Sequence, residues 1–595
     1  MSKTILIAIA WPYANSEIHV GNITGSHLPG DIVARYHRLK GDRVLMVSGT
    51  DSHGTPVTLR ADIDGRPVEE VYQYFHNQFL NLFQKAGISY DLFTTTHTAN
   101  HFKVAQSMFL ALLKNGYLYT ESRPQWYSQA AKRFLPDRYV EGTCYICGHE
   151  GARSDQCDNC GNPLEPEKLI NPRSKLDGST PVLRETTHYF LDLSKLEPDV
   201  EKFLRDRQGY WRETVIAQSL GQIESEGLRP RPITRDLDWG IPVPVEGWEG
   251  KCLYVWFENV IGYLSASIEW SQITGQPDAW RDWWTDLSAK AFYFIGKDNI
   301  FFHAAWWPAQ LKGVGNEFVE IFTGEDGAPL NLPYDVPANQ FMNLEGQKIS
   351  GSRNWAIWGL DILSRYDPDA LRFYLTINMP ELRDSDWDWD EFIARNNNDL
   401  VANWGNCVNR VLPFTHKYWD GLVPEPGELR QADKNIIELV EAGFQTVGEH
   451  LEAVRIRAAL SEALRLASEF NKYQHDTGFW NEIKVDKASA AKSIYTSLRV
   501  IDSLKVLFAP FLPFSSERLN TYLGYDQPIF GEQYIEPQQD RLGTHNALRY
   551  RPPQQGGRWE PSNLQPGQRL GQPAALFKKL DEPGLAQKER DRLGK

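Results

Sequence analysis

Four cysteines stand in two closely spaced pairs in the first third of the chain. Two residues separate Cys144 from Cys147, and two separate Cys157 from Cys160. Two such pairs are a common ligand set for a tetrahedral Zn²⁺ ion with no open coordination position. A redox centre needs only one Cys-x-x-Cys pair, and four unconnected buried thiols need no spacing at all. The spacing therefore predicts a structural zinc knuckle.

A second group of polar residues separates an apolar segment from a helical pattern. Residues 4–10 are continuously apolar, residues 12–22 read PYANSEIHVGN, and residues 31–39 carry apolar side chains at helical spacing. Backbone amides at the start of a helix favour an anion such as phosphate, and His19 and Asn22 add side-chain donors. A lone histidine in a loop is more often merely solvated, so this pattern alone leaves both interpretations open.

These polar residues need a sheet to position them, and the pattern predicts a parallel βαβ unit. A second apolar strand is expected at residues 44–47, before the polar loop at residues 49–56. Strands buried on both faces read as apolar runs, and ligands bind beyond their carboxyl ends. A similar block starts near residue 229, with strands expected at residues 253–257, 291–295 and 318–323. Residues 119–228 separate the blocks as an insertion.

The later part of the chain changes to long helical periodicity. Helices are expected at residues 391–411, 435–447, 455–471 and 488–508, which predicts a helical bundle. Beyond residue 538 the chain is rich in Pro, Gln, Gly and Arg. We expect a largely irregular tail there, packed onto the body near residues 575–580.

Composition excludes several classes of protein. The 595 residues are 41% hydrophobic and 24% charged, as in ordinary multidomain globular proteins. No apolar run approaches the roughly 18 residues of a membrane span, and the apolar core near residue 8 is too short for a signal peptide. The net charge of −14 disfavours nonspecific coating of nucleic acid but allows specific RNA binding. Six cysteines are too few for a disulfide scaffold, so we expect a cytoplasmic protein.

The motifs bear a resemblance to a known family. Residues 19–22 (HVGN) resemble the first signature of class I aminoacyl-tRNA synthetases, usually written His-Ile-Gly-His, and residues 348–352 (KISGS) resemble the second, Lys-Met-Ser-Lys-Ser. Residues 49–56, 254–257, 261–263 and 294–298 are similar to further motifs of the methionyl-tRNA synthetases. The resemblance runs in order from residue 1 to about residue 510.

The resemblance implies an α/β fold with a split Rossmann-type nucleotide-binding domain, a zinc-knuckle insertion and an α-helical anticodon-binding bundle. The expected domains are residues 1–118 and 229–325 for the two catalytic halves, 119–228 for the insertion, 326–388 for the signature-loop region, 389–538 for the bundle, and 539–595 for the tail. The implied reaction is ATP-dependent ligation of L-methionine to methionine tRNA, initiator and elongator, through methionyl-adenylate, with release of AMP and pyrophosphate. Mg²⁺ would accompany ATP. No dimerising OB-type domain follows the bundle, so a monomer is expected.

The resemblance also implies the site residues. Catalytic roles fall on His19, Asn22 and Lys348, and the ATP site comprises Pro12, Asn15, His19, Gly21, Asn22, Lys297, Asp298, Lys348, Ser350 and Ser352. The methionine site comprises Trp11, Tyr13, Asp51, Trp256, Tyr263, His303 and Trp307. Aromatic faces suit a polarizable sulfur, and the Asp51 carboxylate would pair with the ammonium group. Asn406 and Arg410, four apart on one helix face, and Trp480 would read the CAU anticodon by hydrogen bonds and stacking.

Four positions depart from the family pattern. Asn22 replaces the second signature histidine, Gly351 replaces the second signature lysine, Asn259 stands where alanine is usual, and Phe479 stands where proline is usual. The first three motivate an alternative, a tRNA-binding or regulatory paralogue with reduced or lost aminoacylation. The valine, isoleucine and leucine enzymes carry a larger editing insertion, and the cysteine enzyme holds zinc in its pocket. Methionine activation is therefore favoured.

Overall fold

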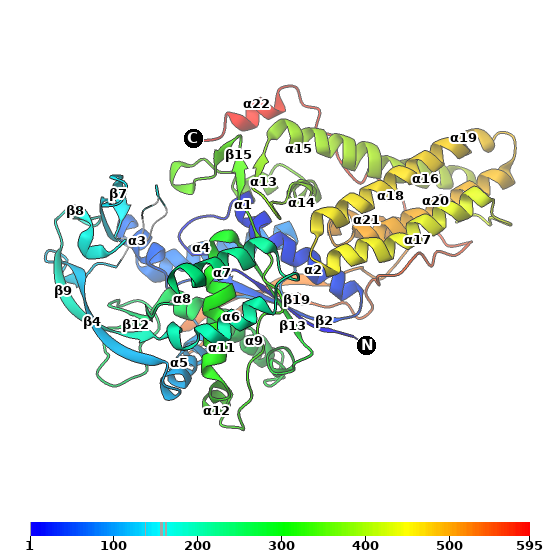
Figure 1. The fold of residues 1–595 in the computed structure, drawn as a ribbon. Helices are drawn as coiled ribbons and strands as arrows, with labels where there is room; N and C mark the ends of the chain where they lie inside the picture. The colour runs from blue at the N-terminus through cyan, green and yellow to red at the C-terminus, as the bar shows by residue number, and fades with distance from the viewer. Residues whose placement is uncertain (1, 137–138, 155–156, 158, 161–163, 595) are drawn as a thin grey trace.

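The computed structural model describes residues 2–594 except 137–138, 155–156, 158 and 161–163, and its centre is a seven-stranded sheet (Figure 1). Five of its strands are parallel, in the order β14 (Ala338–Asn339), β13 (Lys290–Gly296), β1 (Thr4–Ile9), β2 (Arg43–Thr50) and β3 (Leu92–Thr95). Ile5 of β1 lies opposite Val44 on one side and Lys290 on the other. Strands from both predicted blocks thus share one sheet, which confirms the split α/β fold.

Helices cover both faces of this sheet. Ile5, Ile7 and Ile9 of β1 belong to one apolar core, whereas Leu6 and Ala8 belong to another, as the alternation of side chains along a strand requires. The polypeptide leaving β1 becomes helical at α1 (Val20–Asn22), continues through a π-helical turn (Ile23–His27) and ends as α2 (Leu28–Leu39). α4 (Val68–Ala86) packs in the first core, and α5 (Ala99–Lys114) and α9 (Gly262–Ile273) pack in the second.

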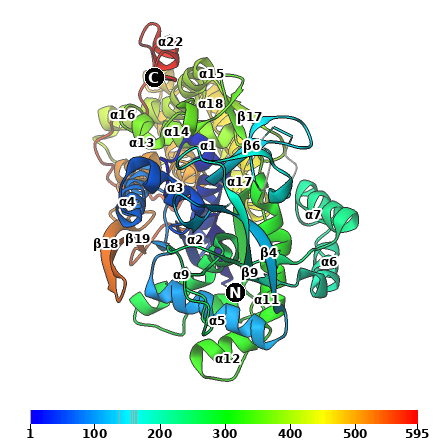
Figure 2. The same ribbon diagram turned by 90° about the vertical axis from the view of Figure 1, so that its left-hand side faces the viewer.

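The insertion is a long antiparallel ribbon that carries a small sheet. β4 (Leu118–Ser128) pairs with β9 (Val182–Leu191), and Figure 2 faces this ribbon. β7 (Glu150–Arg153), β6 (Val140–Thr143) and β8 (Ile170–Ser174) form the small sheet beside the cysteines. α6 (Glu197–Arg205) and α7 (Glu213–Glu226) lead back to the body.

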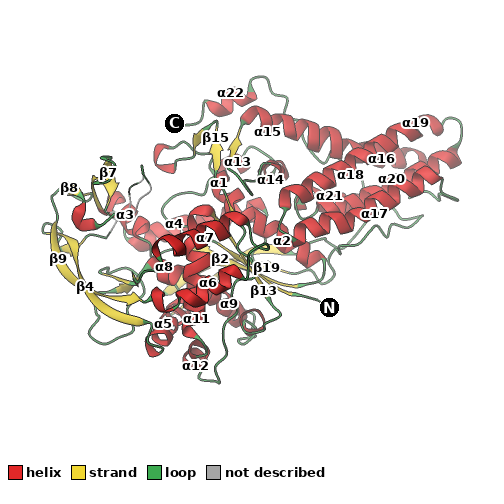
Figure 3. Ribbon diagram, in the orientation of Figure 1, coloured by secondary structure: helices red, strands yellow, loops and turns green. Residues whose placement is uncertain are grey.

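The predicted helical bundle is confirmed (Figure 3). α15 (Trp389–Arg395), a π-helical stretch (Asn396–Gly405) and α16 (Asn406–Trp419) cover the first predicted helix. α17 (Gln431–Glu452), α18 (Ile456–Thr477) and α20 (Lys487–Phe508) match the other three, and α19 (Phe479–Glu482) caps the far end. Among the described helices, none combines the length and apolar character that a bilayer crossing requires.

Three local expectations were wrong. The apolar runs at residues 253–257 and 318–323 are mainly helical, as α8 (Val255–Glu258) and α12 (Glu317–Thr323), because a short buried run has no periodicity that separates strand from helix. The tail is not irregular at its start. β18 (Glu532–Asp540) and β19 (Gly543–Arg551) form a hairpin, and β19 extends the main sheet antiparallel to β3.

The rest of the tail behaves as expected where it meets the body. Leu576 and Phe577 are buried against the main core, which confirms the predicted contact near residues 575–580. A short helix, α22 (Leu585–Arg590), follows.

Candidate active site at the carboxyl edge of the sheet

The site forms where strand order reverses. β1 lies between β2 and β13, and loops that leave adjacent parallel strands in opposite directions open a crevice at their carboxyl ends. The loops after β1 and β2 are hydrogen-bonded there: Asp51 N–H donates to the Pro12 carbonyl at 2.8 Å, and Ala14 N–H to the Asp51 carbonyl at 3.0 Å. Asn15 N–H is turned back onto the Tyr13 carbonyl at 2.9 Å.

His19 caps the helix that leaves β1. Its Nδ1 accepts the Asn22 backbone N–H at 3.3 Å, while Asn22 Oδ1 accepts the His19 backbone N–H at 3.1 Å. Burial lowers the pKa of His19 to about 4, so the ring is neutral at pH 7. Since Nδ1 accepts a hydrogen bond, the proton of the neutral ring lies on Nε2. His19 therefore offers an N–H donor, and not a positive charge, to an anion.

The two signature motifs touch each other. A Cβ atom on Gly21 would lie 3.1 Å from His19 Cε1 and 3.1 Å from Ile349 Cδ1, so a glycine at position 21 lets the second motif approach the first. The segment that follows the second motif is also hydrogen-bonded to the first, because Val20 N–H donates to the Ile357 carbonyl at 3.0 Å and Gly359 N–H to the Ile18 carbonyl at 2.8 Å.

Two lysines flank one aromatic ring beside this contact. Lys297 Nζ lies 4.4 Å and Lys348 Nζ 5.8 Å from the centre of the Phe341 ring. Lys297 is paired with Asp384 at 2.7 Å, whereas Lys348, at the end of β16 (Gln347–Lys348), makes no ion pair with any described residue. Lys348 is therefore the available cation.

The remaining predicted ATP-site residues lie in the adjoining turns. Asp298 is exposed in the turn Lys297–Asn299 that follows β13. Ser350 N–H donates to the Trp355 carbonyl at 2.9 Å. Ser352 lies in the turn Gly351–Arg353, and its side chain lies outside the described part of the structure.

Trp11 belongs to a cluster of aromatic side chains that includes the predicted methionine-site rings. Cβ atoms on Gly49 and Gly262 would lie 2.0 Å and 2.7 Å from its ring, so both glycines are needed for the ring to fit. Tyr263 meets Trp11 edge-on at 6.4 Å. His303 Nδ1 lies 2.9 Å from the Asn299 carbonyl, and because a carbonyl oxygen can only accept, Nδ1 carries the proton of the neutral ring. Nε2 therefore accepts a hydrogen bond from Tyr263 OH at 2.7 Å. Burial lowers the pKa of His303 to about 4.

A second group of rings continues this aromatic cluster. Tyr13 meets Trp256 edge-on at 6.3 Å, and Trp256 stacks on Phe302 at 3.9 Å with the planes 9° apart. Trp307 Nε1–H donates to Tyr293 OH at 3.1 Å, behind Tyr263. Thus each predicted ring contacts another ring of this region. Phe302 and Tyr293 were not predicted, although Phe302 directly precedes His303 in the sequence.

Asp51 is fully buried at the end of β2 and has an unexpected partner. Asn259 Nδ2–H donates to Asp51 Oδ2 at 2.6 Å, and His53 N–H donates to Oδ1 at 3.3 Å. Burial, reinforced by the nearby Glu258 carboxylate, raises the pKa of Asp51, and the Asn259 hydrogen bond acts in the opposite direction. The departure at position 259 is therefore a polar contact to the predicted ammonium-binding carboxylate.

The four cysteines of the knuckle converge. Their sulfur atoms all lie within 4.8 Å of one another, and Cys147 Sγ lies 3.7 Å from Cys157 Sγ. Tetrahedral Zn–S bonds of about 2.3 Å place neighbouring sulfurs roughly 3.8 Å apart, so the donor set fits zinc. Ile146 N–H donates to Cys144 Sγ at 3.4 Å, as suits a thiolate.

The predicted anticodon residues lie on α16 and α19, two helices of the bundle that Figure 1 labels. Asn406 and Arg410 occupy the first turns of α16, and Arg410 is exposed with no ion pair among the described residues. Trp480 is half-buried on α19 and packs on Phe479 at 4.9 Å. Phe479 also packs at 4.9 Å on Phe414, one helical turn beyond Arg410. Thus the phenylalanine that replaces the expected proline joins α19 to α16.

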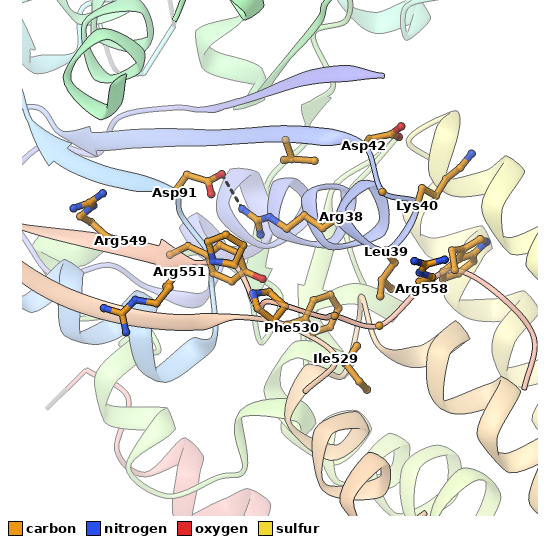
Figure 4. Close-up of a pocket in the computed structure, with 18 of the residues that line it drawn as sticks. Arg38, Leu39, Lys40, Asp42, Asp91, Ile529, Phe530, Arg549, Arg551 and Arg558 are labelled. Carbon is orange, nitrogen blue, oxygen red and sulfur yellow. Dashed lines mark hydrogen bonds and ion pairs between the residues drawn. The ribbon is translucent and has the colours of Figure 1, made fainter. Parts of the chain in front are cut away.

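One large cavity lies away from these residues. It has a volume of about 880 Å³ and opens between the end of α2 and the tail hairpin, near the amino end of β2 (Figure 4). Its arginines are engaged by protein carboxylates: Arg38 pairs with Asp91 at 2.9 Å and Arg549 with Glu536 at 2.6 Å. No predicted site residue lines it.

Comparison with known proteins agrees with this geometry. Residues 5–412 match the family described as tRNA synthetases class I (M), and residues 423–544 match the anticodon binding domain of methionyl tRNA ligase. The chain is 50% identical to a methionine–tRNA ligase of Thermomicrobium roseum, over 100% of this chain and 99% of that protein. It is also 50% identical to the ligase of Roseiflexus castenholzii, over 99% and 98%.

Solved structures share the fold. The Mycobacterium tuberculosis methionyl-tRNA synthetase bound by methionyl-adenylate superposes with a TM-score of 0.74 at 23% identity, over 97% of this chain and all of that chain. Its apo form superposes with a TM-score of 0.67 at 22% identity. With sequence matches that span both the catalytic and the helical parts, the chain belongs to the methionyl-tRNA synthetases, the methionine branch of the class I aminoacyl-tRNA synthetases.

Proposed function

We propose that this protein joins L-methionine to methionine tRNA in two steps. The methionine carboxylate first attacks the α-phosphorus of ATP, forming methionyl-adenylate and releasing pyrophosphate, and a ribose hydroxyl of the terminal tRNA adenosine then takes the methionyl group and releases AMP. The close approach of His19 and Ile349 around Gly21 carries this proposal, because it brings the two signature motifs together at the switch point of the sheet.

The first step depends on positioning and on stabilising charge, since the attacking carboxylate is already a nucleophile. Nε2–H of His19 would donate to a phosphate oxygen as charge builds on it, and the Asn22 amide group would add a second donor. The Lys348 ammonium, unpaired among the described residues, would neutralise the departing pyrophosphate. Mg²⁺ bound with ATP would supply further positive charge to the phosphates.

Methionine would bind against the aromatic cluster with its ammonium group on Asp51. The rings of Trp11, Tyr13 and Trp256 offer faces and edges to the thioether sulfur. The Asn259 hydrogen bond favours the ionised form of Asp51, which the buried ammonium requires.

The helical bundle would recognise the tRNA. Asn406 and Arg410 would hydrogen-bond to the edges of anticodon bases, and Trp480 would stack on an unstacked base. We extend this proposal to both initiator and elongator methionine tRNAs, because they share the CAU anticodon that the bundle would read.

The four cysteines would hold one structural Zn²⁺. When bound, zinc would contribute folding free energy to the small sheet of the insertion. One zinc per chain in freshly purified protein is expected by metal analysis, with the four thiols protected from alkylation. Substoichiometric zinc with freely reactive thiols would contradict the site.

We also propose that the enzyme acts as a monomer in the cytoplasm. The hairpin β18–β19 completes the sheet of its own chain, and four paired thiols as metal ligands suit a reducing compartment. Light scattering on the purified protein tests whether it is a monomer, since a dimer would have twice the mass.

Pyrophosphate exchange with each amino acid in turn tests the function. We expect exchange that depends on ATP and on methionine, with little exchange supported by the other amino acids. Binding of methionine tRNA without any exchange would instead identify a regulatory paralogue, the alternative that Gly351, Asn259 and Asn22 motivate.

A further inference from the structure

The last helix of the chain lies against the region that carries the second signature. Figure 1 shows α22 beside β15 (Met342–Leu344) and α15. We call residues 585–594 the tail segment and residues 348–352 the signature loop. The tail segment contacts a side chain before the signature loop and a backbone carbonyl after it. The sequence motifs gave no indication of these contacts.

The first contact precedes the loop. β15 and β16 are joined by the two residues Glu345 and Gly346, with φ of 49° and 74°. Such a turn suits Asn-Gly or Gly-Gly, and a glutamate in the left-handed region is unfavourable unless its surroundings hold it. Glu345 is held by its carboxylate: Arg590 Nε pairs with Oε2 at 3.0 Å, and Trp389 N–H donates to Oε1 at 3.1 Å.

The second contact follows the loop. Asn354 is again left-handed, with φ of 51°, and its carbonyl accepts the Gly594 N–H at 3.1 Å. The indole N–H of the next residue, Trp355, donates to the Leu344 carbonyl at 3.2 Å, which draws the two sides of the signature loop together. The tail segment thus restrains a residue before Lys348 and a residue after Ser352.

The tail segment has its own anchor on the body. Glu589 is buried and accepts hydrogen bonds from Arg365 Nη2 at 2.8 Å and from Tyr366 OH at 2.9 Å. Arg590 also pairs with Asp390 of α15 at 2.6 Å. These contacts fix the tail segment without help from the signature loop, so the restraint acts from the tail on the loop.

We propose that the tail segment positions the signature loop for adenylate formation, with Arg590 as the positioning residue. This inference rests on the proposed function. Lys348 is exposed, makes no ion pair among the described residues and has its Nζ 5.8 Å from the centre of the Phe341 ring, so its position depends on the backbone of the signature loop. Arg590 would therefore act through Lys348 and not on substrate itself.

The test is a double-mutant cycle on the full-length protein. We expect Arg590→Ala to slow presteady-state adenylate formation about tenfold, as a small misplacement of a charged group does, with methionine affinity unchanged. In a Lys348→Ala background the same change should have little further effect, because the group it positions is gone. Arg590→Lys should restore part of the rate. Arg592→Ala is the matched control, since this neighbouring guanidinium contacts only Glu589, at 3.8 Å, among the described carboxylates.

A second variant distinguishes the loss of this ion pair from a general folding defect. Glu345→Gly removes the same ion pair but places a residue that tolerates the left-handed turn, and it should slow adenylate formation like Arg590→Ala. If the unmodified protein forms methionyl-adenylate and both variants match its rate, or if their effects add to that of Lys348→Ala, the inference is overturned. If the unmodified protein forms no methionyl-adenylate, the proposed function itself fails.

Discussion

The two ring nitrogens of His19 have separate tasks, and two substitutions separate them. Nδ1 caps the helix by accepting the Asn22 N–H at 3.3 Å, while Nε2–H is the proposed phosphate donor. Asparagine places its oxygen where Nδ1 lies but has no donor at the position of Nε2. Glutamine reaches the position of Nε2 with its amide N–H but lacks the cap. His19→Asn should therefore preserve stability and lose rate, and His19→Gln should do the reverse.

The magnitudes follow from these contacts. Loss of a helix cap costs about 1 kcal/mol, so His19→Gln should lower the free energy of unfolding by roughly that amount. Loss of a preorganised donor to a developing oxyanion costs about 100-fold to 1,000-fold in rate, near 2.7 to 4 kcal/mol, so His19→Asn should slow adenylate formation by that factor. Single-turnover adenylate formation and urea unfolding measure the two quantities on the same preparations.

The pH dependence provides an independent check. Burial lowers the pKa of His19 from 6.5 to about 4, so the unfolded chain binds a proton that the folded protein excludes between these pH values. This contribution makes stability fall as the pH drops from about 6.5 to about 4, and His19→Asn should remove it. The reasoning is refuted if His19→Asn retains the full rate, or if adenylate formation requires a protonated group that only His19 supplies.

Three further predictions concern the other proposed roles. Lys348→Ala should slow adenylate formation about 100-fold, near 2.7 kcal/mol, with little change in methionine affinity, and near-neutral kinetics would contradict its role. Asn259→Ala should weaken methionine binding about tenfold, because it removes a hydrogen bond to a buried charge. The loss should be greater at lower pH, because the pKa of Asp51 rises further without this hydrogen bond. Fluorescence titration measures the methionine affinity, and an unchanged affinity would contradict the role of Asn259. Arg410→Ala and Trp480→Ala should each impair tRNA charging, by about 1 to 3 kcal/mol for the stacking residue, while pyrophosphate exchange stays normal; equal damage to both assays would indicate a structural role.

Local patterns in the sequence predicted those parts of the fold whose partners lie nearby. The strand at residues 4–10 and the helix after it were predictable because an apolar run, a polar turn and a helical period follow one another. The tail hairpin was not predictable, because β19 is stabilised by pairing with the distant strand β3, where Leu548 lies opposite Phe93. Ala547 and Leu548 are both buried, one in each core of the sheet, and the Gln-rich and Arg-rich sequence around them gives no strand pattern that would reveal this.

The candidate site shows the same division. The signature motifs and most rings of the aromatic cluster were predictable from the order of the motifs. The hydrogen bond from Asn259 to Asp51 was not predictable, because it joins residues 208 positions apart. The pair of Glu345 with Arg590 likewise depends on the folding of the tail over β15. Contacts of this kind follow from tertiary structure and leave no local signal in one sequence.

The departures from the family pattern are compatible with catalysis, because each is accommodated by its surroundings. Asn22 completes the capping box through Oδ1 and keeps its amide N–H group as a donor. Asn259 donates to Asp51 and so satisfies one oxygen of this buried carboxylate. A Cβ on Gly351 would lie 3.2 Å from the Trp358 ring, which itself packs 6.2 Å from His19. A side chain at position 351 would therefore need Trp358 to shift slightly, whereas glycine fits as Trp358 stands, and Lys348 is the cation that the signature loop retains.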